Sequence, residues 1–172
     1  MKKQYIGLIA VLALILIVTF SFIIYNQWPL MTGKRIVLAT QPIDPFDPFR
    51  GQYITINYEI SRITDIDGLK EGDFIYVILK EDKQGIWRKD SVSKSKPESK
   101  DFIRGEVVSV DGNTSRIKYG IEQYFFERNA ILPRINITSE IMVADSGRAK
   151  LVQLLYNGEP AKLLYEKVSI TS

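Results

Sequence analysis

The sequence contains no cysteine and no histidine in its 172 residues. Without cysteine there is no disulfide bond, no thiol nucleophile and no lipid-modified cysteine anchor. Without histidine there is no Ser-His-Asp triad, and a zinc site built on His or Cys ligands is excluded as well. A domain of this composition must be held together by its hydrophobic core alone.

The sequence also lacks a strong net charge. It has 23 Lys+Arg against 20 Asp+Glu, a formal net charge of +3. Lys2 and Lys3 precede the first apolar segment, so the rest of the chain has 21 basic and 20 acidic residues, or +1. Nucleic-acid binding requires a concentrated basic face, and the Asp65-x-Asp67-Gly68 fragment lacks the further ligands of a calcium loop. We therefore expect no nucleic-acid partner, no bound metal and no cofactor.

The most prominent feature that is present is an uncharged apolar run over residues 5–25. As a helix these 21 residues would be about 31 Å long, which matches the hydrocarbon thickness of a bilayer. A cleaved signal peptide has a shorter apolar region and a small-residue cleavage site, and the end of this run offers no such site. The run predicts an uncleaved transmembrane helix in the lipid bilayer, with Tyr25 and Trp28 at the interface.

The charges beside this run predict its orientation. Lys2 and Lys3 favour a cytoplasmic tail over residues 1–4, although Lys34 and Arg35 on the other side weaken the asymmetry. Residues 26–33, with a proline and a glycine, are expected to form a short linker. We expect a single-pass protein of the cell membrane with an extracytoplasmic domain over residues 34–172.

This domain has the pattern of a β protein. Residues 52–62 alternate, with Ile54, Ile56, Tyr58 and Ile60 on one face, which predicts a strand that packs on the core. Hairpin turns are expected at 111–113 and 145–147, where Asp and Gly separate alternating runs. Residues 91–100 are expected to form a polar loop, and 129–135 a short helix. Further strands are expected over 34–40, 74–80, around 87, and over 102–110, 114–119, 140–144, 148–156 and 161–165. The sequence thus predicts an antiparallel sandwich or barrel of about eight strands.

Two blocks of the sequence resemble a known family. Residues 51–58 read GQYITINY and follow Pro42, Asp44, Pro45 and Arg50. A second block has Tyr119-Gly120-Ile121-Glu122 and then Tyr124-Phe125. Together they are similar to the GDYXXLXY proteins, with the resemblance extending over about residues 36–160. Gln52 stands where the motif has Asp, and Ile56 where it has Leu. The resemblance implies a membrane-associated protein of uncharacterised function and supplies no mechanism.

The expected function is a non-enzymatic module that binds another integral membrane protein. The turn before the alternating strand is stiffened by three prolines, and Arg and Tyr are enriched at binding hot spots. The candidate binding residues are Arg50, Gly51, Gln52, Tyr53, Tyr119, Gly120 and Tyr124. Tyr53 lies on the polar face of its strand, unless a second sheet covers it and makes it part of the core.

Two other functions stay open. Aromatic side chains that include Tyr53, Tyr119 and Tyr124 could bind a cell-envelope glycan. The pairs Ser93-Lys94 and Ser95-Lys96 could belong to an unusual or degenerate Ser-Lys hydrolase, but a lysine in a polar loop is not desolvated enough to act as a base.

Overall fold

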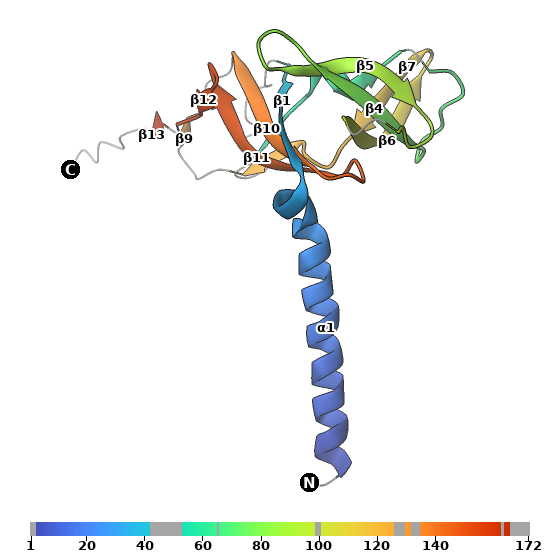
Figure 1. The fold of residues 1–172 in the computed structure, drawn as a ribbon, viewed down its shortest axis with the longest axis vertical. Helices are drawn as coiled ribbons and strands as arrows, with labels where there is room; N and C mark the ends of the chain where they lie inside the picture. The colour runs from blue at the N-terminus through green and yellow to red at the C-terminus, as the bar shows by residue number, and fades with distance from the viewer. Residues whose placement is uncertain are drawn as a thin grey trace, which may run out of the picture.

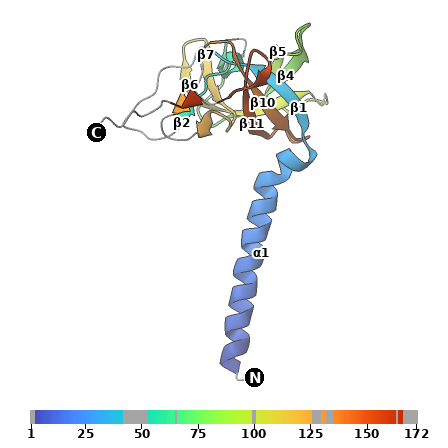
Figure 2. The ribbon, with the colours of Figure 1, turned by 90° about the vertical axis from the view of Figure 1, so that its left-hand side faces the viewer.

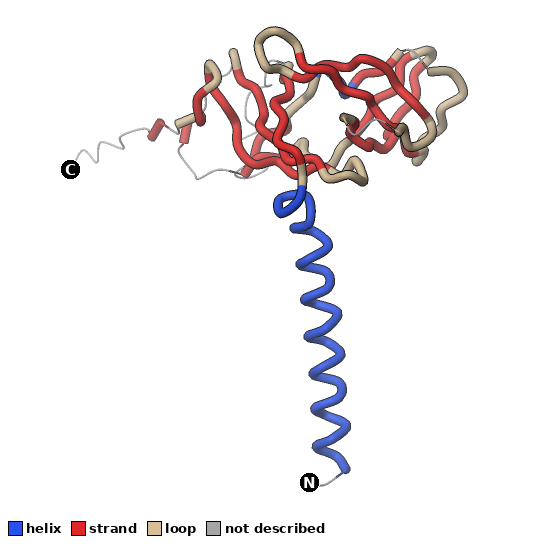
Figure 3. The backbone as a smooth tube through the Cα atoms, in the orientation of Figure 1, coloured by secondary structure: helices blue, strands red, loops and turns tan. Residues whose placement is uncertain are grey.

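The structure is a computed structural model that describes residues 3–41, 53–64, 66–98, 101–125, 130–131, 135–162 and 164–165. One long helix, α1 (Lys3–Thr32), carries a β domain at its C-terminal end (Figure 1). The strands all lie beyond the same end of this helix in both views (Figures 2 and 3). The prediction of a mostly β fold preceded by one apolar helix is confirmed.

The helix α1 contains the predicted apolar run. Its stretch Tyr5–Thr32 contains an 18-residue segment with a mean hydropathy of 3.0 and is long and apolar enough to cross a membrane. Its apolar side chains over residues 5–25 are exposed, because the β domain contacts only the C-terminal end of the helix. The helix is therefore compatible with single-pass anchoring in a bilayer.

The predicted linker over 26–33 is wrong, because α1 continues through Pro29 and ends at Thr32. A proline near the end of a helix removes one backbone hydrogen bond but need not stop the last turn. Two polar side chains bond to helix carbonyls one turn earlier. Asn26 Nδ2 donates to Phe22 O at 2.9 Å, and Thr32 Oγ1 donates to Trp28 O at 3.1 Å. Only Gly33 separates the helix from the first strand.

Most strands belong to one nine-stranded sheet with the order β12-β11-β10-β1-β5-β4-β6-β7-β3. The pair β1–β5 is parallel, and the other pairs of this sheet are antiparallel. Two-stranded sheets are formed by β2 with β8 and by β9 with β13. The two end strands of this order, β12 and β3, are not paired with each other, so the described strands form no closed barrel. A sandwich describes them better. The strands are β1 (Lys34–Ala39), β2 (Tyr53–Thr55), β3 (Arg62–Ile63), β4 (Phe74–Glu81), β5 (Trp87–Ser93), β6 (Phe102–Asp111), β7 (Thr114–Lys118), β8 (Gln123–Phe125), β9 (Ala130–Ile131), β10 (Ile137–Val143), β11 (Ala149–Tyr156), β12 (Glu159–Pro160) and β13 (Leu164–Tyr165).

A single hydrophobic cluster joins the two halves of the large sheet. It includes Leu38 and Ile141 from one half and Ile75 and Ile117 from the other. All four side chains are almost completely buried. Because each half of the sheet covers the same cluster, the two halves fold as one unit.

The prediction of one strand over residues 52–62 is correct for the buried face and wrong for the length of the strand. Its apolar face is confirmed, since Ile54, Ile56, Tyr58 and Ile60 are all buried. The continuous strand over 52–62 is wrong: β2 ends at Thr55, Tyr58 forms an isolated bridge with Thr40, and a 3₁₀ turn η1 (Glu59–Ser61) precedes β3. Buried and exposed residues still alternate along 54–60, because this segment packs against the same core while the chain passes from the β2–β8 pair to the large sheet.

Other local predictions have mixed outcomes. Both hairpins are confirmed, as β6–β7 and β10–β11. The polar loop begins later than expected, because Ser93 still pairs with Tyr76 and β5 ends there. In the region expected to be helical, Ala130 and Ile131 form β9 and pair with β13. In both of these segments a partner strand, β4 in the first and β13 in the second, supplies backbone hydrogen bonds that the composition of the segment itself does not reveal.

Candidate functional site

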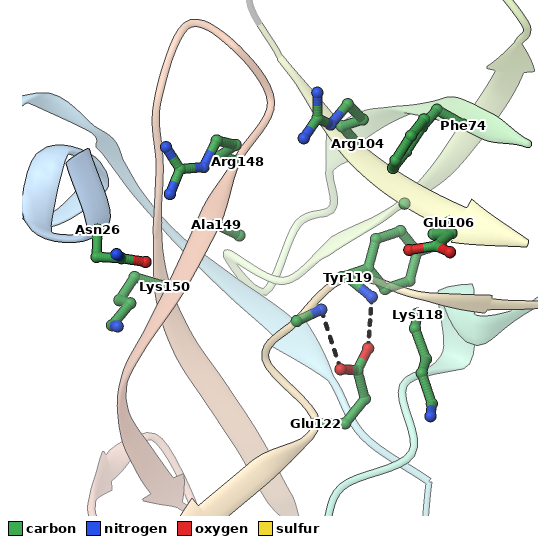
Figure 4. Close-up of a pocket in the computed structure, with 12 residues that line it drawn as sticks. Asn26, Phe74, Arg104, Glu106, Lys118, Tyr119, Glu122, Arg148, Ala149 and Lys150 are labelled. Carbon is green, nitrogen blue, oxygen red and sulfur yellow. Dashed lines mark hydrogen bonds between the residues drawn. The ribbon is translucent and has the colours of Figure 1, made fainter. Parts of the chain in front are cut away.

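A pocket of about 410 Å³ lies where the C-terminal end of α1 meets the β domain (Figure 4). Its walls come from four parts of the chain: the helix end, β4 with β6, the end of β7 with the segment after it, and the start of β11. The lining residues are Asn26, Phe74, Arg104, Gly105, Glu106, Lys118, Tyr119, Gly120, Glu122, Arg148, Ala149 and Lys150.

The turn between β10 and β11 closes one side of this pocket. Arg104 N donates to Gly147 O at 2.8 Å, which ties the turn to β6. Gly147 has a φ of +79°, and a Cβ there would lie 2.7 Å from the Phe102 ring. Glycine is therefore required for both the backbone conformation and the close approach. This docking brings Arg148 opposite Arg104 across the pocket (Figure 4).

The opposite side of the pocket is held in shape by Glu122. Its carboxylate accepts hydrogen bonds from the backbone N–H groups of Tyr119, at 2.5 Å, and Gly120, at 3.0 Å (Figure 4). Gly120 has a φ of +79°, which an L residue rarely adopts. The Glu122 carboxylate thus satisfies two N–H groups that would otherwise face the pocket.

The Tyr119 ring forms part of the core beneath the pocket. Its hydroxyl donates to Ile60 O, and its ring packs against Gly105, where a Cβ would lie 2.7 Å from a ring carbon. Burial raises the pKa of Tyr119 well above its usual value, and the nearby Glu122 carboxylate adds to this shift. The phenol is therefore neutral and serves as a structural hydrogen-bond donor.

Basic side chains outnumber acidic ones around the pocket. Arg104, Lys118, Arg148 and Lys150 face two carboxylates, Glu106 and Glu122. Among the residues that the structure describes, no carboxylate forms an ion pair with any of these four basic groups. The Arg104 guanidinium lies 4.8 Å from the Phe74 ring centroid instead.

Three basic residues outside the pocket do form ion pairs with described carboxylates. Lys34 pairs with Asp101 at 2.6 Å, and Arg35 pairs with the buried Glu140 at 2.9 Å. Arg88 pairs with two carboxylates, and the pKa of its guanidinium is raised by those hydrogen bonds. The pocket thus gathers four basic groups, none of which pairs with a described carboxylate, in a domain whose overall charge is nearly balanced.

The pocket is joined to α1 by Arg148. Pro29 has no N–H, so the Tyr25 carbonyl one turn earlier lacks its usual helix partner. Arg148 Nη1 donates to this carbonyl at 3.0 Å, and the guanidinium carbon lies 3.7 Å from the Tyr25 ring centroid. Gly33 follows the last residue of the helix, and a Cβ there would lie 2.3 Å from Pro29 O and 3.0 Å from the Val143 backbone. The helix end and β10 are thus packed directly against one another.

The candidate residues from the sequence have different positions. Tyr119 and Gly120 line the pocket. Tyr53 begins β2 and pairs with Phe125, and Ile54 pairs with Tyr124, so the two motif blocks form one two-stranded ribbon. Tyr124 is half-buried and packs against the core. Arg50, Gly51 and Gln52 lie outside the described residues.

Sequence reasoning missed the four basic residues of the pocket. Arg104-x-Glu106 and Arg148-x-Lys150 each put two charged residues on one face of a strand, which is a signal of an outward-facing charged surface. That signal does not say that these strands meet. The meeting depends on Arg104 N bonding to Gly147 O, a contact between residues 43 positions apart.

The segments considered for catalysis and metal binding show ordinary structural contacts. Lys94 Nζ donates to the carbonyls of Asp67, at 2.8 Å, and Gly68, at 3.2 Å, and Ser93 Oγ donates to Ser95 O at 2.8 Å. Lys94 is exposed, so it is not desolvated. Within the described residues there is no group of three or more acidic side chains that could hold a metal ion.

These features define a class of protein in which one N-terminal apolar helix carries a mostly β domain. The sequence model of the GDYXXLXY protein family matches residues 15–154, so the chain belongs to the GDYXXLXY family. The match covers both motif blocks and most of the β10–β11 hairpin. No match was found among curated proteins or among solved structures. The function of the family is uncharacterised.

Proposed function

We propose that this protein is a non-enzymatic accessory module of the cell membrane, with α1 as an uncleaved signal-anchor and the β domain outside the cytoplasm. The domain binds another integral membrane protein close to the bilayer. The observation that supports this best is the junction between helix and domain. Since α1 ends at Thr32 and β1 begins at Lys34, the domain has no flexible linker with which to reach a distant target.

Side-chain contacts also fix the domain relative to the helix. Arg148 satisfies the Tyr25 carbonyl that Pro29 leaves without a partner, and Gly33 allows β10 to approach the helix end. A domain held in this way presents the same surface at the same height above the membrane. Binding of a second membrane protein then carries a smaller ordering cost than it would with a mobile tether.

The β2–β8 ribbon supports a position for the contact surface. Phe125, the register partner of Tyr53, is 69% exposed. Large aromatic side chains are frequent at the centres of protein interfaces. We place the contact surface on this ribbon and on the preceding turn, with Arg50, Gly51, Gln52 and Tyr53 as the candidate contact residues and Tyr124 as support from the core side.

The orientation rests on the charges at the start of the chain. Lys2 and Lys3 are retained in the cytoplasm by the tendency of basic flanks to stay inside. Lys34 and Arg35 are the first two residues of β1 and pair with Asp101 and Glu140, which lowers their effect on insertion.

In-membrane crosslinking of the full chain tests this function. A photoreactive amino acid at Phe125 should give an adduct with an integral membrane protein, and Tyr53→Ala should reduce the adduct strongly. A photoreactive group at Lys83, which is exposed in the β4–β5 turn, is the matched control and should give none. Insertion of a flexible Gly/Ser segment after Thr32 should also reduce the adduct while the domain remains folded. Equal adducts from both positions, or none from Phe125, would contradict the proposal.

A further inference from the structure

The basic pocket lies at the depth of the lipid headgroups if α1 spans a bilayer. The apolar run ends at Tyr25, and the next residue, Asn26, lines the pocket. The run is about 31 Å long as a helix and fills the hydrocarbon core, so the headgroup layer begins directly beyond it. Arg148 contacts both the carbonyl and the ring of Tyr25, which places its charge at this boundary.

The chemistry of the pocket suits an anion better than a cation. The basic side chains form no ion pair with any described carboxylate. The carboxylate of Glu122 is already bonded to two backbone N–H groups, so it is not available to bind a basic ligand. Glu106 lies opposite Lys118 in the β6–β7 register and offsets part of the positive charge. The remaining groups are guanidinium and ammonium donors, which bind phosphate well.

We propose that this pocket binds the phosphodiester headgroup of an anionic phospholipid from the leaflet on the domain side. Arg104 and Arg148 approach the headgroup from opposite walls, and Lys118 and Lys150 add charge at its edges (Figure 4). A volume of about 410 Å³ is within the range of small-molecule sites. This inference rests on α1 as a membrane span and is independent of the proposed protein partner.

Competition between two lipids on the purified full chain tests the inference. Native mass spectrometry in mixed micelles with equimolar phosphatidylglycerol and phosphatidylcholine gives the ratio of the two bound lipids. We expect a preference for phosphatidylglycerol of about tenfold, and a reduction of this preference by about fivefold or more in Lys118→Gln/Lys150→Gln. Arg104→Gln should reduce it in the same direction. These variants leave the Arg148–Tyr25 contact intact, so the helix junction is unchanged.

A matched control separates this site from net charge. Lys80→Gln/Lys83→Gln removes two exposed basic groups outside the pocket and should keep the full preference. Equal loss in the control would show that general electrostatic attraction alone is responsible, and equal binding of both lipids to the unchanged protein would overturn the proposal. Displacement of phosphatidylglycerol by an excess of soluble glycerol phosphate would show that the pocket takes a free phosphate ester, which would also overturn the lipid assignment.

Discussion

Replacement of Ile56 by Asp is expected to unfold the β domain. Ile56 is completely buried in the main core cluster, and its N–H donates to Glu122 O at 2.7 Å. This bond connects the first motif block to the segment that shapes the pocket. The residue therefore supports both the core and the pocket wall.

The magnitude follows from the burial. Truncation to Ala would remove three buried carbon atoms, each contributing about 0.8 kcal/mol by transfer alone. The cavity left behind brings the cost of such a truncation into the range of about 2–5 kcal/mol. Asp adds a carboxyl group without a prepared partner, so Ile56→Asp should cost at least about 3 kcal/mol. Thr55→Asp, on the exposed neighbouring position, is the matched control and should cost less than about 1 kcal/mol.

Urea unfolding of the full chain in a mild detergent measures this difference. The chain has two tryptophans, so Trp28→Phe leaves the buried Trp87 as the fluorescent reporter of the domain. Ile56→Asp should shift the midpoint to much lower urea or abolish the transition, and Thr55→Asp should leave it nearly unchanged. A midpoint for Ile56→Asp equal to that of the parent would refute the assignment of the buried face.

Three other outcomes are expected. Gly105→Ala should cost about 1–3 kcal/mol in the same urea assay, because its Cβ would lie 2.3 Å from Ile117 Cγ2, whereas Gly7→Ala in open space should be neutral. Burial raises the pKa of Tyr58 and Tyr119 above the usual value near 10, so the unfolded chain releases these protons first as pH rises. The contribution of these two tyrosines to stability should therefore be constant below about pH 9.5 and fall above pH 10 by up to about 1.4 kcal/mol per pH unit for each tyrosine. A Tyr119→Phe variant that kept the full slope would contradict this. Protease added to intact protoplasts should remove the domain, and protection until lysis would reverse the proposed orientation.

Local patterns predicted the elements that depend on local chemistry. The alternation of residues 54–60 gave the buried face correctly, and the Asp-Gly and Asp-Ser-Gly turns gave both hairpins. The break of this strand was not predictable in the same way. Tyr53 pairs with Phe125, whereas Tyr58 pairs with Thr40. The tertiary fold, not the local sequence, determines that the two ends of this segment have different partner strands.

The helix end and the pocket were missed for a related reason. Pro29 reads locally as a helix stop, but the carbonyl it leaves without a partner is satisfied by Arg148, which is 123 residues away from Tyr25. The pocket likewise requires Gly147 to dock on Arg104. Basic residues on separate strands carry no local signal that they will share one site.

The distance of the domain from the membrane tests the account most directly. Val143 pairs with Lys34 at the helix end, so the turn at Ser146 lies beside the junction between helix and domain. Trp87 pairs with Leu38, further along β1, and the β4–β5 turn with Lys83 lies on the far side of the domain. Since the chain has no cysteine, Ser146→Cys and Lys83→Cys each give a single site for a fluorescent label in the full chain in lipid bilayers. A nitroxide quencher on the lipid headgroups should quench the label at position 146 strongly and the label at position 83 weakly, and a flexible insertion after Thr32 should reduce this difference. Equal quenching at both positions in the unmodified junction would contradict a domain held against the bilayer.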